Sequence, residues 1–204
     1  MITALCALIL SVKASDDVLF DFTSGDLGPW KEISDTVRKP GMSKAVISLQ
    51  KTQLFQRAVM FAMINPQPNG AGFAGVTTFI PSSAASHACS TGLRLKVRAQ
   101  GQLKHWKVVL TDKSQAGSMD KTRRDYELKF QVETDMAVSG RQFEAVELPF
   151  ADFRAYERGA EVKDAPPLDL TKTAVFGVQT FGGVYSSYKQ EGTGSLEIDS
   201  VSFY

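Results

Sequence analysis

Few residues in this 204-residue chain are suited to catalysis or cofactor binding, and the most suggestive are three glycines with the spacing of a dinucleotide-binding loop. Gly70, Gly72 and Gly75 match that fingerprint, which works only where a strand precedes it and a helix follows it. Here a proline-rich turn comes before the glycines and a β-rich segment, Val76 to Ile80, comes after them. We therefore expect these glycines to serve a tight turn and a close contact between strands.

Metal and acid–base chemistry find little support in the remaining residues. The two histidines, His87 and His105, lack the spacing of a zinc site and have no paired cysteines beside them. Carboxylate pairs alternate with apolar neighbours, which is typical of the outward face of a strand: Glu133/Asp135, Glu147/Asp152 and Glu197/Asp199. A glycosidase-type pair and a calcium site built from loop oxygens are the alternatives. We predict no catalytic residue, no cofactor and no metal, and hence no enzyme.

Aromatic residues in turns are better candidates for contact with another molecule. Tyr185 and Tyr188 lie in a segment too rich in glycine and serine to be a core strand, and Trp106 follows a short turn. Exposed aromatic rings supply apolar area and flat faces for a sugar or a protein. We therefore take Trp106, Tyr185 and Tyr188 as candidate partner-contacting or ligand-contacting residues, and expect Trp30 to lie in the core.

Short segments of alternating apolar and polar residues must position these side chains. In the clearest one, Leu93 to Ala99, every second residue is apolar and most residues between them are charged, as in a half-buried strand. Similar segments occur at 18–22, 45–50, 58–64, 73–80, 106–110, 126–132, 143–150, 173–181 and 195–204. Their number predicts an all-β, two-sheet antiparallel sandwich of jelly-roll type with few short helices. A closed up-and-down barrel is the competitor, but the long connections at 81–91, 112–122 and 155–172 favour crossovers between two sheets.

The stretch 143–159 combines a strand with a sharp stop. Pro149 cannot donate to a strand ladder, so we expect the strand to end there or to lie at a sheet edge. Phe150 and Phe153 follow as two aromatic anchors over a turn, and Gly159 closes the segment at a position suited to positive φ.

The start of the chain has the pattern of a leader. Residues 1–14 form an apolar run too short to span a bilayer, followed by Ser15 and two aspartates, which predicts a signal peptide and entry to the secretory pathway. A mitochondrial presequence would be arginine-rich, whereas the first arginine is Arg38. Residues 15–204 would then form a single domain with no membrane span and with Cys89 as its one thiol, which favours a buried free thiol over an intermolecular bridge.

The charges balance, with 23 lysines and arginines against 22 aspartates and glutamates. A nucleic-acid-binding domain carries a basic excess, so no nucleic-acid partner is expected.

Several motifs in a fixed order resemble the family of complex I intermediate-associated protein 30. They include Trp30 and Asp35, the Asn69-Gly70 turn, Leu148-Pro149-Phe150-x-x-Phe153, and Pro166-Pro167-Leu168-Asp169. The family's Asp-Ser-Val-Met-Gly-Gly-x-Ser segment has its counterpart in residues 35–43, without the double glycine. The resemblance implies a galactose-binding-like jelly roll and a mitochondrial assembly-factor role with no reaction of its own.

Two functions follow as alternatives. The resemblance favours a non-catalytic, chaperone-like module that holds a protein partner such as an assembly intermediate, in the mitochondrion if the family's location applies. The leader and the sandwich favour a secreted or lumenal carbohydrate-binding domain that holds a glycan.

Overall fold

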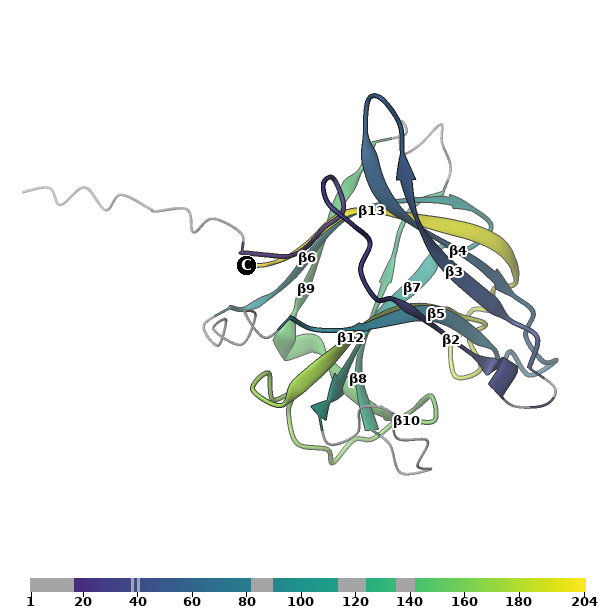
Figure 1. The fold of residues 1–204 in the computed structure, drawn as a ribbon. Helices are drawn as coiled ribbons and strands as arrows, with labels where there is room; N and C mark the ends of the chain where they lie inside the picture. Colours follow the sequence, from purple (N-terminus) through teal and green to yellow (C-terminus); the bar gives the residue numbers. More distant parts are fainter. Residues whose placement is uncertain (1–16, 38, 40, 82–89, 114–123, 135–141) are drawn as a thin grey trace, which may run out of the picture.

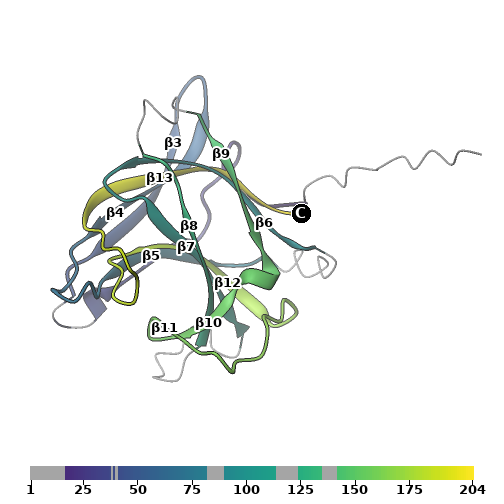
Figure 2. The same ribbon diagram turned by 180° about the vertical axis from the view of Figure 1, so that it is seen from behind.

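Two antiparallel β-sheets packed face to face make up the domain (Figures 1 and 2). The computed structural model describes residues 17–37, 39, 41–81, 90–113, 124–134 and 142–204. Helical structure among these residues includes two short 3-10 turns, η1 (Asp35–Val37) and η4 (Phe150–Asp152). The predicted all-β sandwich with few short helices is confirmed.

The first layer, sheet A, has six strands. Its strand order is β3-β4-β13-β6-β9, and β1 pairs with the second half of β13. The strands are β1 (Asp17–Asp21), β3 (Lys44–Lys51), β4 (Gln56–Ile64), β6 (Gly92–Gly101), β9 (Glu144–Pro149) and β13 (Gly192–Phe203). Because β13 is long and central, residues at the end of the chain contact β4 on one side and β6 on the other.

The second layer, sheet B, has seven strands in the order β11-β10-β8-β7-β12-β5-β2. They are β2 (Lys31–Ser34), β5 (Phe73–Phe79), β7 (His105–Asp112), β8 (Arg124–Gln131), β10 (Arg154–Glu157), β11 (Ala160–Glu161) and β12 (Thr173–Phe181). Strand β12 is central, with β7 and β5 on its two sides.

The core lies between the sheets and follows the two-residue period of the strands. Leu93, Leu95, Val97 and Ala99 on β6 are all buried, as their alternation predicts. Trp30 packs against this core as expected, with its ring 5.3 Å from Phe20, 5.9 Å from Phe22 and 6.1 Å from Phe176 between centroids.

The stretch 143–159 carries the chain from one sheet to the other. Strand β9 is the edge strand of sheet A and ends at Pro149, η4 follows, and β10 enters sheet B. Both predictions for Pro149 are therefore confirmed. Gly159 has φ of +83° and Arg158 also has positive φ, so the turn into β11 uses two left-handed residues.

Two of the three predicted crossovers are wrong. The connection at 81–91 does lead from β5 in sheet B to β6 in sheet A. By contrast, the connection at 112–122 joins β7 to its neighbour β8, and 155–172 leads from β10 to β12 within sheet B. A long connection therefore does not by itself indicate a change of sheet.

The side chains of β1 that point into the core also differ from those that simple alternation predicts. Simple alternation in the segment 18–22 predicts one face for Val18, Phe20 and Phe22, but Val18 is exposed while Leu19 is buried. The register of β1 against β13 shifts between Val18 and Phe20, which is the effect of a β-bulge.

The three glycines at 70, 72 and 75 serve a turn and a strand contact, as predicted. Gly70 has φ of +85° in the turn before β5. Gly75 lies in β5 opposite Gln179, and a Cβ atom there would come within 2.3 Å of the Val178 carbonyl oxygen.

Candidate functional site

Exposed apolar side chains gather on one hairpin of sheet A. Of the nine large hydrophobic residues that are exposed in the described part of the chain, six belong to β3, β4 and the residues that flank and join them: Met42, Val46, Leu54, Phe55, Phe61 and Met63. The tip of this hairpin reaches the edge of the molecule in Figures 1 and 2. We call the outward surface formed by these six side chains the hairpin face.

Strand pairing brings part of the hairpin face together. Phe61 on β4 lies directly opposite Val46 on β3 and Ser195 on β13, and Met63 lies opposite Lys44. An open groove of about 640 Å³ runs across these strands. Its lining includes Val46, Phe61 and Met63 as apolar walls, with residues of β2, β6 and β13 completing it: Glu32, Gln100, Gly101, Thr193, Gly194 and Ser195.

The loop between the sheets fixes one end of this groove. The carboxylate of Asp35 accepts hydrogen bonds from the backbone N–H of Ser43 at 2.8 Å and from its hydroxyl at 2.9 Å, and both residues are buried. Ser43 immediately precedes Lys44, whose Nζ lies 3.1 Å from a carboxylate oxygen of Glu32 on β2. The segment 35–43 therefore joins β2 to β3 and places an ion pair at the rim of the groove.

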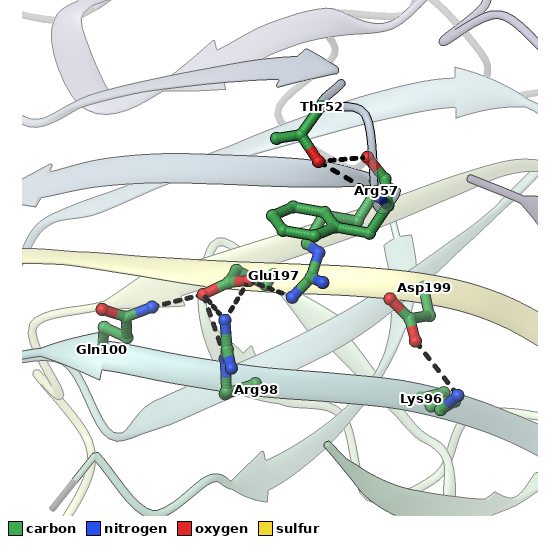
Figure 3. Close-up of polar contacts among 8 residues, drawn as sticks. Thr52, Arg57, Lys96, Arg98, Gln100, Glu197 and Asp199 are labelled. Carbon is green, nitrogen blue, oxygen red and sulfur yellow. Dashed lines mark hydrogen bonds and ion pairs between the residues drawn. The ribbon is translucent and has the colours of Figure 1, made fainter. Parts of the chain in front are cut away.

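A buried carboxylate beside the groove joins three strands of sheet A (Figure 3). The side chain of Glu197 on β13 is only 5% exposed. Arg57 of β4 donates to Glu197 Oε2 at 2.7 Å, and Arg98 of β6 donates to both carboxylate oxygens at 2.7 and 2.8 Å. Gln100 donates a further hydrogen bond to Oε1. We call these four residues the Glu197 clamp.

Aromatic rings cover the cations of the Glu197 clamp. The guanidinium carbon of Arg57 lies 3.9 Å from the ring centroid of Phe55 and 4.7 Å from that of Phe143, while that of Arg98 lies 5.1 Å from Phe143. Such cation–π contacts are favourable, and they also limit water access to the clamp. The hairpin tip is therefore tied to the centre of the sheet.

The Glu197 clamp is not arranged for acid–base catalysis. Burial alone would raise the pKa of Glu197, but hydrogen bonds from Arg98 and Arg57 outweigh it and hold the pKa below the ordinary value. A carboxyl group with a lowered pKa is ionised near neutral pH and is a poor proton donor. The arrangement therefore positions strands rather than moving protons.

Three of the other carboxylates that were candidates for catalytic pairs are also ion-paired. Glu147 lies 2.9 Å from Arg94, Asp199 lies 3.1 Å from Lys96, and Glu133 lies 3.0 Å from Lys104. No group of three or more His, Cys, Asp or Glu residues that could hold a metal occurs among the described residues. His87, Cys89 and Asp135 lie outside them, as do residues 1–14.

Trp106 is not available to a ligand, which corrects its selection as a candidate site residue. It is fully buried on β7, where Trp106, Val108 and Leu110 all point into the core. The alternation that predicted this strand already placed the indole on the inward face.

Tyr185 and Tyr188 lie in the segment that follows β12, on the side of sheet B. Tyr188 is half-buried, and its ring stacks on His105 with centroids 3.7 Å apart. Tyr185 is exposed. Neither residue lines the groove of sheet A, so the structure separates the tyrosine candidates from the hairpin face.

Sequence reasoning missed the hairpin face. The signal was present in the run Val59 to Ile64, where the residues between the core positions are also apolar instead of polar. Such a two-sided run normally predicts a strand buried on both faces. Here the outward face of β4 is covered at Val59 but not at Phe61 and Met63, which are exposed.

Solved structures with a similar fold include carbohydrate-binding modules and an agarase. A family 11 carbohydrate-binding module from Clostridium thermocellum, in complex with a β-1,3-1,4-mixed-linked tetrasaccharide, aligns with a TM-score of 0.64 and 14% identity over 93% of this chain and 96% of that one. The same family's module from the cellulase Lic26A-Cel5E of C. thermocellum gives 0.60 with 15% identity, covering 93% and 94% of the two chains. An exo-β-agarase gives 0.53 with 10% identity, covering 92% of this chain and 24% of that one. At these identities the likeness shows the fold, a galactose-binding-like sandwich.

No curated protein sequence matches the chain. The sequence model of one family, described as complex I intermediate-associated protein 30, does match, and it spans residues 20–198. That span covers sheet B, most of sheet A, the hairpin face and the Glu197 clamp. The chain therefore belongs to the complex I intermediate-associated protein 30 family.

Proposed function

We propose that this domain is a non-catalytic protein-binding module whose hairpin face and adjoining groove hold the partner. The observation that carries the proposal is the concentration of exposed apolar side chains on one hairpin. A contiguous apolar patch rimmed by polar groups is typical of protein-interaction sites. The family description, which names association with a complex I intermediate, supports a protein as the class of partner.

The composition of the groove suggests what kind of segment it would hold. Val46, Phe61 and Met63 supply an apolar centre, and the Glu32–Lys44 ion pair and Gln100 supply a polar rim. Covering the apolar centre would contribute about 25 cal/mol per Å² removed from water. We propose an apolar partner segment flanked by polar residues, with an aromatic or branched side chain entering the groove.

The Glu197 clamp would support binding by holding the surface rigid. It links β4, β13 and β6 beneath and beside the groove through charged hydrogen bonds. A preorganised surface loses less conformational entropy when a partner binds. The clamp residues are therefore positioning residues in this proposal, whereas Phe61 and Val46 would contact the partner.

Charge placed in the apolar centre tests the proposal. We expect Phe61→Glu to weaken binding of the partner about tenfold or more, because a carboxylate would be buried without a counter-charge. The matched control is Phe79→Glu, since Phe79 is 62% exposed, against 52% for Phe61, and lies on the outward face of sheet B. The measurement is quantitative affinity purification from the native cells, followed by titration of the purified complex.

Two outcomes would contradict the proposal. One is equal retention of the partner by Phe61→Glu and Phe79→Glu. The other is a wild-type domain that sediments as a dimer and becomes a monomer on Phe61→Glu, because the hairpin face would then be covered by a second copy of the chain.

The compartment of the protein is a further proposal. The leader pattern at residues 1–14 supports secretory entry and a domain of residues 15–204, and the family supports a mitochondrial location as the alternative. No helix in the part of the chain that the structure describes is long and apolar enough to cross a membrane. Sequencing the mature N-terminus and fractionating a tagged protein would separate the two locations.

Carbohydrate binding is the second candidate function. The fold is similar to that of a family 11 module solved with a bound tetrasaccharide, and this supports a glycan as an alternative ligand. The specific observation in its favour is that Tyr185 and Tyr188 lie with other aromatic and polar side chains on the side of sheet B.

A further inference from the structure

The outward face of sheet B carries polar side chains that are unusually buried. Lys107 on β7, Glu127 on β8 and Gln179 on β12 point away from the core, because their neighbours along each strand point into it, yet each is at most 8% exposed. Phe181, two residues after Gln179, is buried on the same face. Outward positions on a sheet that faces water would be far more exposed. These side chains are therefore recessed among their neighbours, and only a small part of each reaches the surface.

Lys107 and Glu127 form an ion pair at the middle of this face. Lys107 Nζ donates to Glu127 Oε1 at 2.6 Å, and both side chains are about one-tenth exposed. Lys129, opposite Lys107 on β8, adds a second ammonium group. The carboxylates of Glu127 and Glu161 lie close enough to Lys129 to favour its charged form. Both ammonium groups therefore have carboxylate partners within the face.

Gln179 has no hydrogen-bond partner for its side-chain amide among the described residues, although the residue is only 7% exposed. It lies on the central strand β12, directly opposite Lys107 on one side and Gly75 on the other. Its Cγ occupies the space that a side chain at position 75 would need, since a Cβ there would lie 2.5 Å from it. The amide nitrogen and oxygen of Gln179 are not among the fully buried, unpaired atoms of the described residues, so both reach the surface of this face. A ligand with hydroxyl groups would form hydrogen bonds with this amide in place of water.

Aromatic rings surround this polar centre. Tyr188 stacks on His105 and lies 6.2 Å from Phe181, and Lys129 Nζ lies 5.0 Å from the ring of Tyr156 and 5.4 Å from that of Phe181. These rings come from four segments of the chain: β7, β10, the end of β12 and the segment after it. Their convergence on one face is not a consequence of core packing, because all of them lie outside the core cluster.

The protonation states around the rings suit a neutral ligand. Burial, together with the charge of Lys104, lowers the pKa of His105, so its imidazole is neutral at pH 7. Burial and the nearby carboxylates raise the pKa of Tyr156, so its hydroxyl stays protonated and can donate. Tyr185, whose ring would lie 3.7 Å from a Cβ at Gly159, extends the aromatic surface to the β10–β11 turn.

We propose that the outward face of sheet B is a binding site for a neutral saccharide, in which Gln179 and the Lys107–Glu127 pair bind hydroxyl groups and Tyr188 and Tyr156 stack on the sugar rings. Sugars present apolar C–H faces and equatorial hydroxyls, which match flat rings beside buried amide and charged groups. The site rests on the second candidate function. It lies on the sheet opposite the hairpin face, so both surfaces can be occupied together.

The test is calorimetric titration with a panel of neutral tetrasaccharides: cellotetraose, laminaritetraose, maltotetraose, mannotetraose and chitotetraose. We expect at least one to bind, and Gln179→Leu and Tyr188→Ala each to weaken it about tenfold or more. Phe61→Glu, on the other sheet, should leave this affinity unchanged. Gln179→Leu should also unfold at no lower temperature than wild type, because the amide that it removes makes no hydrogen bond in the described structure.

The possible results of the titration distinguish a wrong binding site from the absence of carbohydrate binding. If none of the tetrasaccharides binds, both the site and the second candidate function are overturned. If one binds and both Gln179→Leu and Tyr188→Ala keep full affinity while remaining folded, the proposed site is overturned but carbohydrate binding stands. Loss of affinity in Phe61→Glu alone would place the sugar on sheet A instead.

Discussion

Replacing Trp106 with alanine is expected to lower the free energy of unfolding by about 3–5 kcal/mol, which is typical of removing a large aromatic side chain from a packed core. Trp106 is fully buried on β7, opposite Thr180 of β12 and Phe130 of β8. The neighbouring layers cannot close the resulting cavity because strand pairing on both sides holds them in place. Chemical denaturation followed by circular dichroism measures the change.

Trp106→Phe is the control for this prediction. The indole nitrogen of Trp106 is buried and has no hydrogen-bond partner among the described residues, so phenylalanine removes volume without breaking a polar contact. We expect it to cost clearly less than alanine. A Trp106→Ala protein that is as stable as wild type but loses affinity for a ligand would show that Trp106 lies at a surface site.

Replacing Glu197 with alanine should also lower the free energy of unfolding strongly. We expect a loss of about 3–5 kcal/mol, because two arginines would remain buried without their counter-charge. Arg57 and Arg98 have side chains only 11% and 20% exposed, and both point at the Glu197 carboxylate (Figure 3). Equilibrium denaturation in urea provides the measurement.

Glu147→Ala is the matched control for the Glu197 clamp. Glu147 pairs with Arg94 on the same outward face of sheet A, but its side chain is more than half exposed. An exposed ion pair contributes at most about 1 kcal/mol. If Glu147→Ala and Glu197→Ala lowered the free energy of unfolding equally, burial would not explain the contribution of the Glu197 clamp.

The contribution of Glu197 should also depend on pH. Its pKa in the folded protein lies below the ordinary value of 4.5, despite burial, because of hydrogen bonds from Arg98 and Arg57. The carboxylate is therefore favoured by folding, so its stabilising effect is fully present above pH 4.5 and is lost as the pH falls through the folded pKa. The stability difference between wild type and Glu197→Gln should shrink over that acidic range, whereas a difference that grows would contradict the assignment.

Much of the fold follows from local pattern in the sequence. Alternation on β6 and β7 identified strands and their inward residues, and Pro149 marked the end of an edge strand because it lacks an N–H. The short strands β2 and β10 were missed, since four residues give too few repeats to establish a period. Connections were misjudged because loop length does not specify which sheet receives the next strand.

The candidate sites depend on pairings between distant strands, and the local alternation of apolar and polar residues does not predict such pairings. Phe61 becomes part of a groove only because β4 pairs with β3 and β13 in one particular register. Likewise, Gln179 gains room for its side chain because Gly75, about a hundred residues earlier, lies directly opposite it. These pairings are long-range, and a single sequence does not reveal them.

Photo-crosslinking from position 61 tests most directly whether the hairpin face of sheet A binds a protein. A benzoylphenylalanine residue would replace Phe61 in one sample and Phe79 in the other, and each domain would be irradiated in its native cells. We expect position 61 to form a crosslink to one protein, Val46→Glu to abolish that crosslink, and position 79 not to form it. Crosslinking of that protein from position 79 and not from position 61 would show that the hairpin face is not the binding surface.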